Sequence, residues 1–501
     1  MKILYKNNTD ELILLAMKSD TARKGDYLLI HDQKSNKKII VQIYSEDYLS
    51  SQSLIEDIVK DEVVVASSIE NLHDPLDIGN LSRMIRDARL FKAKMRASID
   101  SESKFTNEIT WLPSRVYSKI NRMKISEINN LVKRTGLYSI RLGSSGLDEE
   151  QFEIYAEDLD GKLNIVTGKK ESGKSHLSKI LIKTLVEYGA FVIVFDLNNE
   201  YGGLAWNGNG TLSTLHEQVT ILEPGEGLKF SLDYCGKAAI SSMLQNALDM
   251  PAASLREFFR IWDWLENKNT LDMEALGNAI NTWNTNELVR DALISRFHAI
   301  SSSGLFVSTL NLSDDGLRFE ELVSKRQGLA LIMNMGKAMP VVRRMIVELV
   351  LTKVVELLEK GIIPPIFLFA EEAHLYIRDT YWEDIITRMR HFGIYTTFIT
   401  NQPDAISDGV YRQVDNIFLF NFTNDTDLDK ISKVSLADNE TVKSIVRTLP
   451  QRQCLVIGKV VRDLPMVVKI TSADIMALGQ TKTFFKTGSR AKDISSVSQI
   501  Q

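Results

Sequence analysis

The first part of the chain carries short apolar, β-rich runs that are separated by polar turn residues. The clearest runs are at residues 11–17, 25–45, 91–99, 137–145 and 151–159. Several short strands with turn signals predict a small barrel or sandwich. Helical patterns at 78–90 and 125–134 interrupt them. We therefore expect an N-terminal β-barrel domain with helical insertions over residues 1–158.

The pattern changes near residue 159, where longer apolar runs begin to alternate with helical segments. A strand at 162–168 precedes a helix at 174–189 and a second strand at 190–197. The same pattern returns later as a helix at 339–360, a closing hairpin at 454–470, and strands at 328–335, 364–374, 394–400 and 416–422. Strands that alternate with helices predict a parallel sheet covered by helices. We expect one α/β core built from residues 159–235 and 301–478.

Two further segments differ from this core. Residues 236–300 carry apolar side chains three to four positions apart, which predicts an inserted helical bundle. The tail, 479–501, is polar and weakly patterned, so it is either disordered or a strap on a neighbouring subunit.

Composition narrows the class of protein. The 501 residues are 44% hydrophobic and 25% charged, as in an ordinary globular protein, and the net charge of −5 argues against a surface coated with nucleic-acid-binding lysines. A basic groove inside an acidic shell remains compatible with that charge. Cys235 and Cys454 match no metal spacing and are expected to be buried free thiols in a reducing cytoplasm. No apolar run reaches the ~18–20 residues of a membrane span, and no signal peptide is recognisable, so we expect a cytoplasmic protein without a membrane partner.

The segment GKKESGKS, residues 168–175, fits the phosphate-loop pattern G-x-x-x-x-G-K-[ST] between a predicted strand and a predicted helix. Gly168 and Gly173 allow the backbone N–H groups to approach phosphate oxygens closely. Lys174 is expected to reach the β- and γ-phosphates, and Ser175 to offer its hydroxyl to Mg²⁺. The predicted ligands are therefore ATP and Mg²⁺. The predicted nucleotide-binding residues are Gly168, Lys169, Lys170, Glu171, Ser172, Gly173, Lys174, Ser175 and His176.

Two adjacent glutamates end the predicted strand at 364–374. Buried neighbouring carboxylates repel each other, but a divalent cation and a triphosphate remove that objection. In P-loop motors the strand beside the phosphate loop ends in an acid that holds Mg²⁺, and the next residue polarises the attacking water. Glu371 is thus the predicted metal carboxylate and Glu372 the predicted base. Glu371 is one methylene longer than the expected aspartate, so its contact with the metal shell is expected to differ.

Other strand ends add polar residues. Asp196 and Glu200 follow the strand at 190–197, and Gln402 follows the strand at 394–400. The carboxyl ends of parallel strands meet at the edge of the sheet where ligands bind. Gln402 is therefore placed to sense the γ-phosphate or the attacking water, and Asp196 and Glu200 are secondary candidates.

Taken together, these motifs resemble the HerA branch of the HerA–FtsK superfamily of ring-shaped DNA translocases. The matching stretches are GKKESGKS, VFDLNNEYGGL, LKFSLDY, FLFAEEAHLYI, RMRHFGIYTTFITNQP and CLVIGKVVRDLPMVVKI. The resemblance implies a RecA-like (ASCE) P-loop core, preceded by a small β-barrel. It also implies a homo-hexamer that hydrolyses ATP at subunit interfaces and moves duplex DNA through a central channel.

The same resemblance suggests roles for several basic residues. Arg390, in RMRHFG, corresponds to an arginine finger that reaches a neighbour's γ-phosphate, and Arg388 and Arg412 are lesser candidates. Lys162 lies where the family often has a basic residue before the first core strand. Arg378, after His374, is a candidate DNA contact.

Two functions remain open at this stage. The first is an ATP-dependent DNA translocase or helicase that works with a partner, either a NurA-type nuclease in end processing or an effector in anti-phage defence. The second is a nucleotide-gated ring scaffold that assembles and activates such an effector with little translocation. DNA-stimulated ATP hydrolysis distinguishes them, because only a motor requires it.

Overall fold

The chain divides into two compact units in a computed structural model. One comprises Met1–Leu177 with Thr400–Thr471, and the other Ser178–Ile399 with Ser472–Gln501. The structure describes residues 1–17, 19–48, 88–101, 104–131, 135–146, 148–307, 316–376, 386, 388–422, 424–434 and 437–479. Three predictions fall wholly or partly outside these residues: the helical pattern at 78–90, the end of the one at 125–134, and the tail at 479–501. Arg378 also lies outside them.

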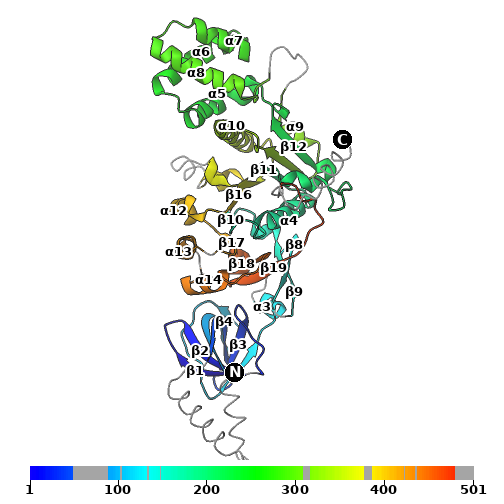
Figure 1. Cartoon of the computed structure of the whole chain (residues 1–501), viewed down its shortest axis with the longest axis vertical. Helices are drawn as coiled ribbons and strands as arrows, with labels where there is room; N and C mark the ends of the chain where they lie inside the picture. The colour runs from blue at the N-terminus through cyan, green and yellow to red at the C-terminus, as the bar shows by residue number, and fades with distance from the viewer. Residues whose placement is uncertain are drawn as a thin grey trace, which may run out of the picture. The chain divides into compact units, whose positions relative to one another are not determined.

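The N-terminal segment of the first unit forms a curved antiparallel sheet in the order β1-β2-β5-β4-β3-β7 (Figure 1). Its strands are β1 (Lys2–Lys6), β2 (Glu11–Ala16), β3 (Tyr27–Asp32), β4 (Lys37–Tyr48), β5 (Arg89–Ile99), β6 (Phe105–Thr106), which pairs with β5, and β7 (Ser118–Arg122). Alternate residues such as Leu14, Leu28, Ile30, Val41 and Phe91 are completely buried and form its core. The runs at residues 11–17, 25–45 and 91–99 therefore predicted β2, β3, β4 and β5 correctly, whereas β1, β6 and β7 were not predicted.

A second set of strands in the same unit begins with β10 (Asn164–Thr167), which runs parallel to β17 (Asn416–Phe420). β18 (Gln453–Gly458), β19 (Met466–Ile470), β8 (Ser139–Ser145) and β9 (Glu150–Tyr155) continue it as antiparallel neighbours. The expected barrel boundary at residue 158 had placed β8 and β9 with the barrel. β8 pairs instead with β19, and β9 pairs with β8, because a local sequence pattern predicts a strand but not its partner. Helices α3 (Ile125–Leu131), α12 (Asp408–Tyr411), α13 (Asp425–Val434) and α14 (Asn439–Val446) complete this unit.

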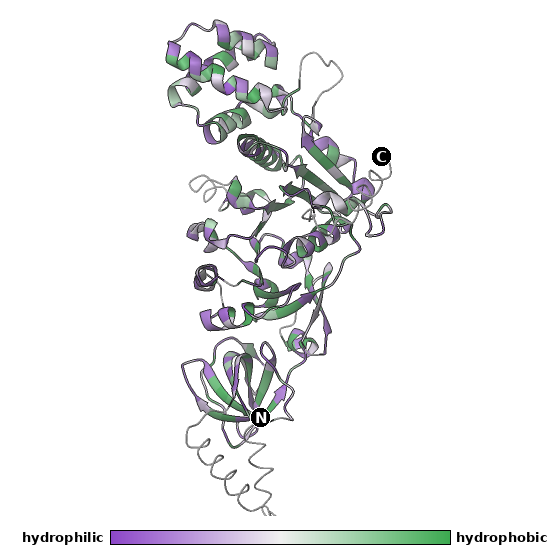
Figure 2. Ribbon diagram, in the orientation of Figure 1, coloured by the Kyte–Doolittle hydropathy of each residue, from purple (hydrophilic) through white to green (hydrophobic). Residues whose placement is uncertain are grey.

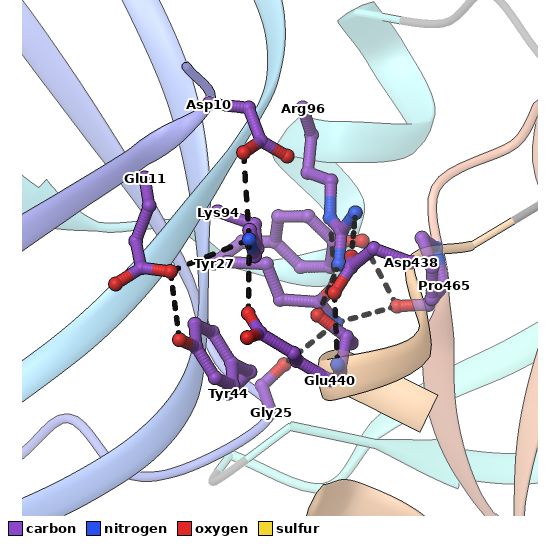
Figure 3. A network of polar contacts seen from close by, with 12 residues as sticks. Asp10, Glu11, Gly25, Tyr27, Tyr44, Lys94, Arg96, Asp438, Glu440 and Pro465 are labelled. Carbon is purple, nitrogen blue, oxygen red and sulfur yellow. Dashed lines mark hydrogen bonds and ion pairs between the residues drawn. The ribbon is translucent and has the colours of Figure 1, made fainter. Parts of the chain in front are cut away.

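A polar network joins the barrel strands to the start of α14 (Figure 3). Arg96 donates to Asp438 over 2.7 Å and to the hydroxyl of Thr441 over 2.8 Å. Lys94 lies 3.1 Å from Glu440, and Tyr27 donates to the carbonyl oxygen of Pro465 over 2.9 Å. Asp438 is also the N-cap of α14, because it accepts a hydrogen bond from the Thr441 N–H. One carboxylate thus starts a helix and holds the barrel.

The second unit contains a parallel sheet in the order β13-β12-β14-β11-β15-β16. Its strands are β11 (Phe191–Asp196), β12 (Val219–Pro224), β13 (Gly227–Leu228), β14 (Leu329–Asn334), β15 (Ile366–Glu371) and β16 (Ile394–Thr400). Every residue of β11 and β14 is buried, and these central strands are almost uniformly hydrophobic (Figure 2). Such runs are typical of strands covered on both faces. Within β11, β14 and β15, the polar residue is the last one of each strand.

Helices make up the rest of the second unit. α5 (Leu232–Ser242) and the π-helical turn Met243–Ala247 pack on α10 (Pro340–Glu359), while α6 (Ala252–Asn267), α7 (Met273–Thr282) and α8 (Glu287–Ser302) pack on one another (Figure 1). α9 (Phe319–Ser324) is short. Trp262 is buried inside this helical group, whereas Trp264 is 42% exposed. Among the described residues, none of the helices has the length and apolarity needed to cross a membrane.

Candidate nucleotide site

The phosphate loop lies between the end of β10 and the start of α4 (Lys174–Glu187), as predicted. Gly168 has φ +157°, and a Cβ on it would lie 2.5 Å from the Cβ of Phe420. Gly173 has φ +120°, and a Cβ there would lie 3.1 Å from the Phe420 ring. Both positions therefore require glycine, because the loop is wrapped closely around the end of β17.

Backbone hydrogen bonds fix the loop to neighbouring chain segments. The N–H of Lys169 donates to Asn421 O over 3.0 Å, and the N–H of Arg452 donates to Ser172 O over 2.9 Å. The hydroxyl of Ser172 is buried and has no hydrogen-bond partner among the described residues. An unpaired buried hydroxyl in this loop fits a site that receives phosphate oxygens.

Lys174 is buried, and its ammonium spans the loop. Nζ donates to Gly168 O over 2.8 Å and to Lys169 O over 2.9 Å. These two carbonyl oxygens fix the position of the Lys174 ammonium group within the phosphate loop. Ser175 follows in the first turn of α4, where backbone N–H groups lack helical partners, and His176 Nε2 lies 2.6 Å from Thr471 O. The glycine turn, the ammonium and the helix N-terminus fit a nucleotide phosphate chain.

Two predicted acids lie side by side at the ends of β11 and β15. Asp196 accepts hydrogen bonds from the backbone N–H groups of Asn198 (3.2 Å), Glu200 (3.2 Å) and Tyr201 (2.9 Å). Glu371 accepts from the N–H of Leu197 (3.1 Å), the N–H of Asn198 (3.3 Å) and the Asn198 side-chain amide (3.1 Å). Both carboxylates therefore hold the loop that follows β11.

Burial and charge perturb these acids. Burial raises the pKa of Glu371, and the charges of Asp196 and Glu200 raise it further. Burial also raises the pKa of Asp196. The hydrogen bonds from Tyr201, Glu200 and Asn198 lower it, but burial has the larger effect. Burial lowers the pKa of Lys179, which lies in α4. The charges of Glu200, Asp196 and Glu371 raise it, but burial has the larger effect. A buried set of interacting titratable groups at a sheet edge is typical of a functional site.

Glu372, the predicted base, has an unusual backbone. It adopts φ 46° and ψ 45°, the left-handed region, and its side chain is 16% exposed. Its N–H donates to Ile399 O over 2.7 Å, and its carboxylate lies 3.5 Å from His374 Nδ1. A glutamate in this conformation persists only where the surrounding structure holds it, which is common at active sites.

The remaining predicted residues have separate positions. Gln402 is exposed, and its N–H donates to the Thr400 hydroxyl over 3.0 Å. Arg390 is exposed near the end of the helical segment that precedes β16. Lys162 is partly exposed, and its N–H donates to Leu159 O over 3.2 Å.

The predicted residues fall into two groups. Gly168–His176 and Gln402 belong to the first unit, whereas Asp196, Glu200, Glu371, Glu372 and Arg390 belong to the second. Within the second unit the structure brings Asp196, Glu200 and Glu371 together. No cluster of three or more His, Cys, Asp or Glu side chains suited to a metal ion occurs among the described residues.

Three residues that interact with Asp196, Glu200 or Glu371 were not predicted from the sequence: Lys179, Asn198 and Tyr376. Tyr376 donates its hydroxyl to Glu371 O over 2.9 Å, and burial raises its pKa, helped by the charges of Glu371, Glu372 and Asp196. The polar run after β11, LNNE, was a usable signal for Asn198. No comparable sequence signal marks Lys179 or Tyr376, because neither residue belongs to a recognisable motif.

Part of the chain matches a known family, and the chain is similar to a characterised relative. Residues 166–352 match the family model described as "Helicase HerA, central domain". The "DNA double-strand break repair helicase HerA" of Saccharolobus solfataricus is 22% identical over 415 residues, which cover 73% of this chain and 79% of that protein.

Two solved structures share the fold. VirB4 of Thermoanaerobacter pseudethanolicus matches with a TM-score of 0.50 and 14% identity, over 68% of this chain and 98% of that chain. Plasmid coupling protein TrwB, in complex with a non-hydrolysable ATP analogue, matches with a TM-score of 0.51 and 13% identity, over 72% and 96%. The fold and the phosphate loop thus define a RecA-like P-loop ATPase. The family match over residues 166–352 and the relative in Saccharolobus solfataricus support a HerA-type ATPase that hydrolyses ATP.

Proposed function

We propose that this chain is the subunit of a homo-hexameric, ATP-driven motor that moves along duplex DNA. The observation that carries the proposal is the glycine-bounded phosphate loop, spanned by the buried Lys174 ammonium, inside the segment that matches the HerA central domain. The relative in Saccharolobus solfataricus is described as a DNA double-strand break repair helicase, which favours DNA as the substrate.

Nucleotide binding is assigned to the phosphate loop. The backbone N–H groups of residues 168–175 would surround the phosphates, Lys174 would reach the β- and γ-phosphates, and Ser175 would hold Mg²⁺ with Glu371 on the metal side. The cation, when bound, neutralises charge on the phosphates. The Glu371 carboxylate already accepts three hydrogen bonds from the loop after β11, so in this proposal it also shapes that loop.

Hydrolysis is assigned to four side chains. Glu372 accepts a proton from the attacking water, and Gln402 orients that water or senses the γ-phosphate. Lys174 stabilises charge that develops on the transferred phosphoryl group. Arg390, exposed in the segment before β16, is proposed to do so in a neighbouring subunit, which would couple hydrolysis around the ring.

The proposed partner is a NurA-type nuclease or a defence effector that receives or cleaves the translocated DNA. In the competing function, the ring is a nucleotide-gated scaffold that activates such an effector with little movement of DNA. Both use the same nucleotide site, so DNA dependence of turnover is the quantity that separates them.

The decisive experiment measures ATP hydrolysis with and without duplex DNA, on protein whose assembly mass is determined by native mass spectrometry. A motor gives a six-subunit mass and DNA-stimulated hydrolysis. Slow, DNA-independent turnover in a ring of that mass supports the scaffold. A monomer without stimulation contradicts the motor. Lys174→Ala serves as the background control, because hydrolysis that persists in it belongs to a contaminant.

A further inference from the structure

We propose that Tyr376 is a positioning residue for Glu372, acting through the peptide group that joins Glu371 to Glu372. This inference rests on the proposed role of Glu372 as the base. Tyr376 touches no reacting group in the proposed mechanism. Its hydroxyl holds the backbone from which the base projects.

Both ends of one peptide group are fixed by hydrogen bonds. The carbonyl oxygen of Glu371 accepts from the Tyr376 hydroxyl over 2.9 Å, and the N–H of Glu372 donates to Ile399 O over 2.7 Å. A peptide group is planar, so fixing its C=O and its N–H fixes the orientation of the whole plane. The rotations on either side of it, ψ of Glu371 and φ of Glu372, are then held together.

Glu372 needs this support because its φ of 46° and ψ of 45° are unfavourable for any side chain with a Cβ. A change of φ toward a negative value would relieve this strain. Where ψ of Glu371 does not compensate, that change turns the Cα–Cβ bond of Glu372 and carries the carboxylate with it. The two hydrogen bonds oppose that relaxation, one from β16 and one from Tyr376.

Tyr376 is itself held firmly. Its side chain is buried, and its ring meets Phe195 edge-on, with centroids 6.0 Å apart and an interplanar angle of 77°. Phe195 directly precedes Asp196 in β11, so the ring is supported by the strand beside β15. The Tyr376 N–H donates to Ala373 O over 3.1 Å, which closes the turn after Glu372. Phenylalanine would fill the same space, so only the hydrogen bond to Glu371 O requires tyrosine.

The consequence for catalysis is geometric. A general base must lie within hydrogen-bond reach of the water that it activates, and a displacement of about 1 Å costs on the order of 100-fold in rate. Tyr376→Phe removes one of the two hydrogen bonds and keeps the ring. We expect kcat to fall about tenfold, with little change in KM or in the affinity for ATP.

The test measures kcat and KM for ATP and the dissociation constant of a fluorescent ATP analogue, in wild type, Tyr376→Phe, Glu372→Gln and the double variant. If Tyr376 acts only through Glu372, its removal has no further effect in the Glu372→Gln background. Tyr27→Phe is the matched control, because Tyr27 is similarly buried and donates to a backbone carbonyl, Pro465 O, within the other compact unit. It should lose stability without losing kcat.

Amide hydrogen exchange at Glu372 gives a readout that is independent of turnover. We expect slow exchange in wild type and faster exchange in Tyr376→Phe, measured below the unfolding transition of each variant. Unchanged kcat, an unchanged exchange rate, or an equal fall of kcat in the Glu372→Gln background would each overturn the positioning role. If Glu372→Gln alone retains near-normal turnover, the proposed base is wrong, which is a different failure.

Discussion

Asp196 and Glu371 end neighbouring parallel strands, and both carboxylates accept a hydrogen bond from the same backbone N–H, that of Asn198, over 3.2 and 3.3 Å. Both carboxylates are almost completely buried. The repulsion expected of adjacent buried acids is therefore offset by amide donors from one loop. The ends of β11 and β15 and the loop after β11 are thus joined by hydrogen bonds within the protein itself.

Removing the Asn198 side chain tests this assembly. Asn198→Ala loses the 3.1 Å hydrogen bond from the side-chain amide to Glu371 but keeps the backbone bonds. Because an acceptor on a buried carboxylate is left unpaired, we expect a loss of about 1–2 kcal/mol, or a Tm lower by about 3–5 °C in thermal unfolding. Asn207→Ala also loses side-chain hydrogen bonds, but in an exposed turn, and should change Tm by less. Equal shifts would show that the buried contact adds nothing.

Glu372→Gln tests the proposed base. The amide has nearly the same shape but cannot accept a proton from water, so we expect kcat to fall about 100-fold or more while ATP affinity is retained. Phosphate release and nucleotide binding are the measurements. Glu217→Gln, at a side chain that is 86% exposed, is the matched control and should behave as wild type. Near-normal turnover in Glu372→Gln would remove Glu372 from the mechanism.

Gly168→Ala tests the close approach of the phosphate loop to β17. The new Cβ would lie 2.5 Å from the Cβ of Phe420, which cannot move without its backbone. We expect ATP affinity to fall about tenfold or more, because relieving that overlap displaces the loop. Gly161→Ala is the control. Gly161 also has a positive φ, +66°, but nothing lies within 4 Å of its added Cβ. If both variants bind ATP equally, the overlap with Phe420 is not limiting.

The contact of Arg96 with Asp438 predicts a pH-dependent contribution to stability. Burial alone would raise the pKa of Asp438, but the charge of Arg96 and the hydrogen bonds of Thr441 and Arg96 lower it on balance. A carboxylate with a lowered pKa stabilises the folded state above its unfolded pKa, about 3.9, and that contribution disappears as the pH falls through the folded value.

Arg96→Met should therefore lower Tm by about 5 °C at pH 7, and the difference from wild type should shrink below about pH 4. Thermal unfolding across this range is the measurement. Arg260→Met, at a side chain that is 71% exposed, should show little difference at either pH. A gap between Arg96→Met and wild type that widens in acid would contradict the assignment.

Much of the fold follows from local pattern. The uniformly apolar runs of β11 and β14 identify strands that are buried on both faces, and the alternating apolar and polar residues of β5 identify a strand with one apolar face. The glycines and the lysine of the phosphate loop were also readable, since that chemistry needs fixed residues at fixed spacing.

The parts that sequence did not provide depend on contacts between distant residues. Nothing local in Tyr376 shows that its hydroxyl folds back to Glu371 O, and nothing in Arg96 shows that its partner is Asp438, which lies 342 positions away. The predicted metal role of Glu371 came from its place after a strand. Its hydrogen bonds to the loop after β11 became visible only when the chain was folded.

The pairing of β8 with β19 has a consequence for biosynthesis. Ser145 pairs with Val468 and Gly143 with Ile470, so β8 is synthesised long before the strand with which it pairs. Domains generally fold as units during translation, and a pairing of such high sequence separation is slow to close. Until the ribosome has released β19, β8 and β9 expose an unpaired edge. We expect nascent chains that end before Met466 to depend on chaperones, although the barrel strands that precede them can already pair with one another.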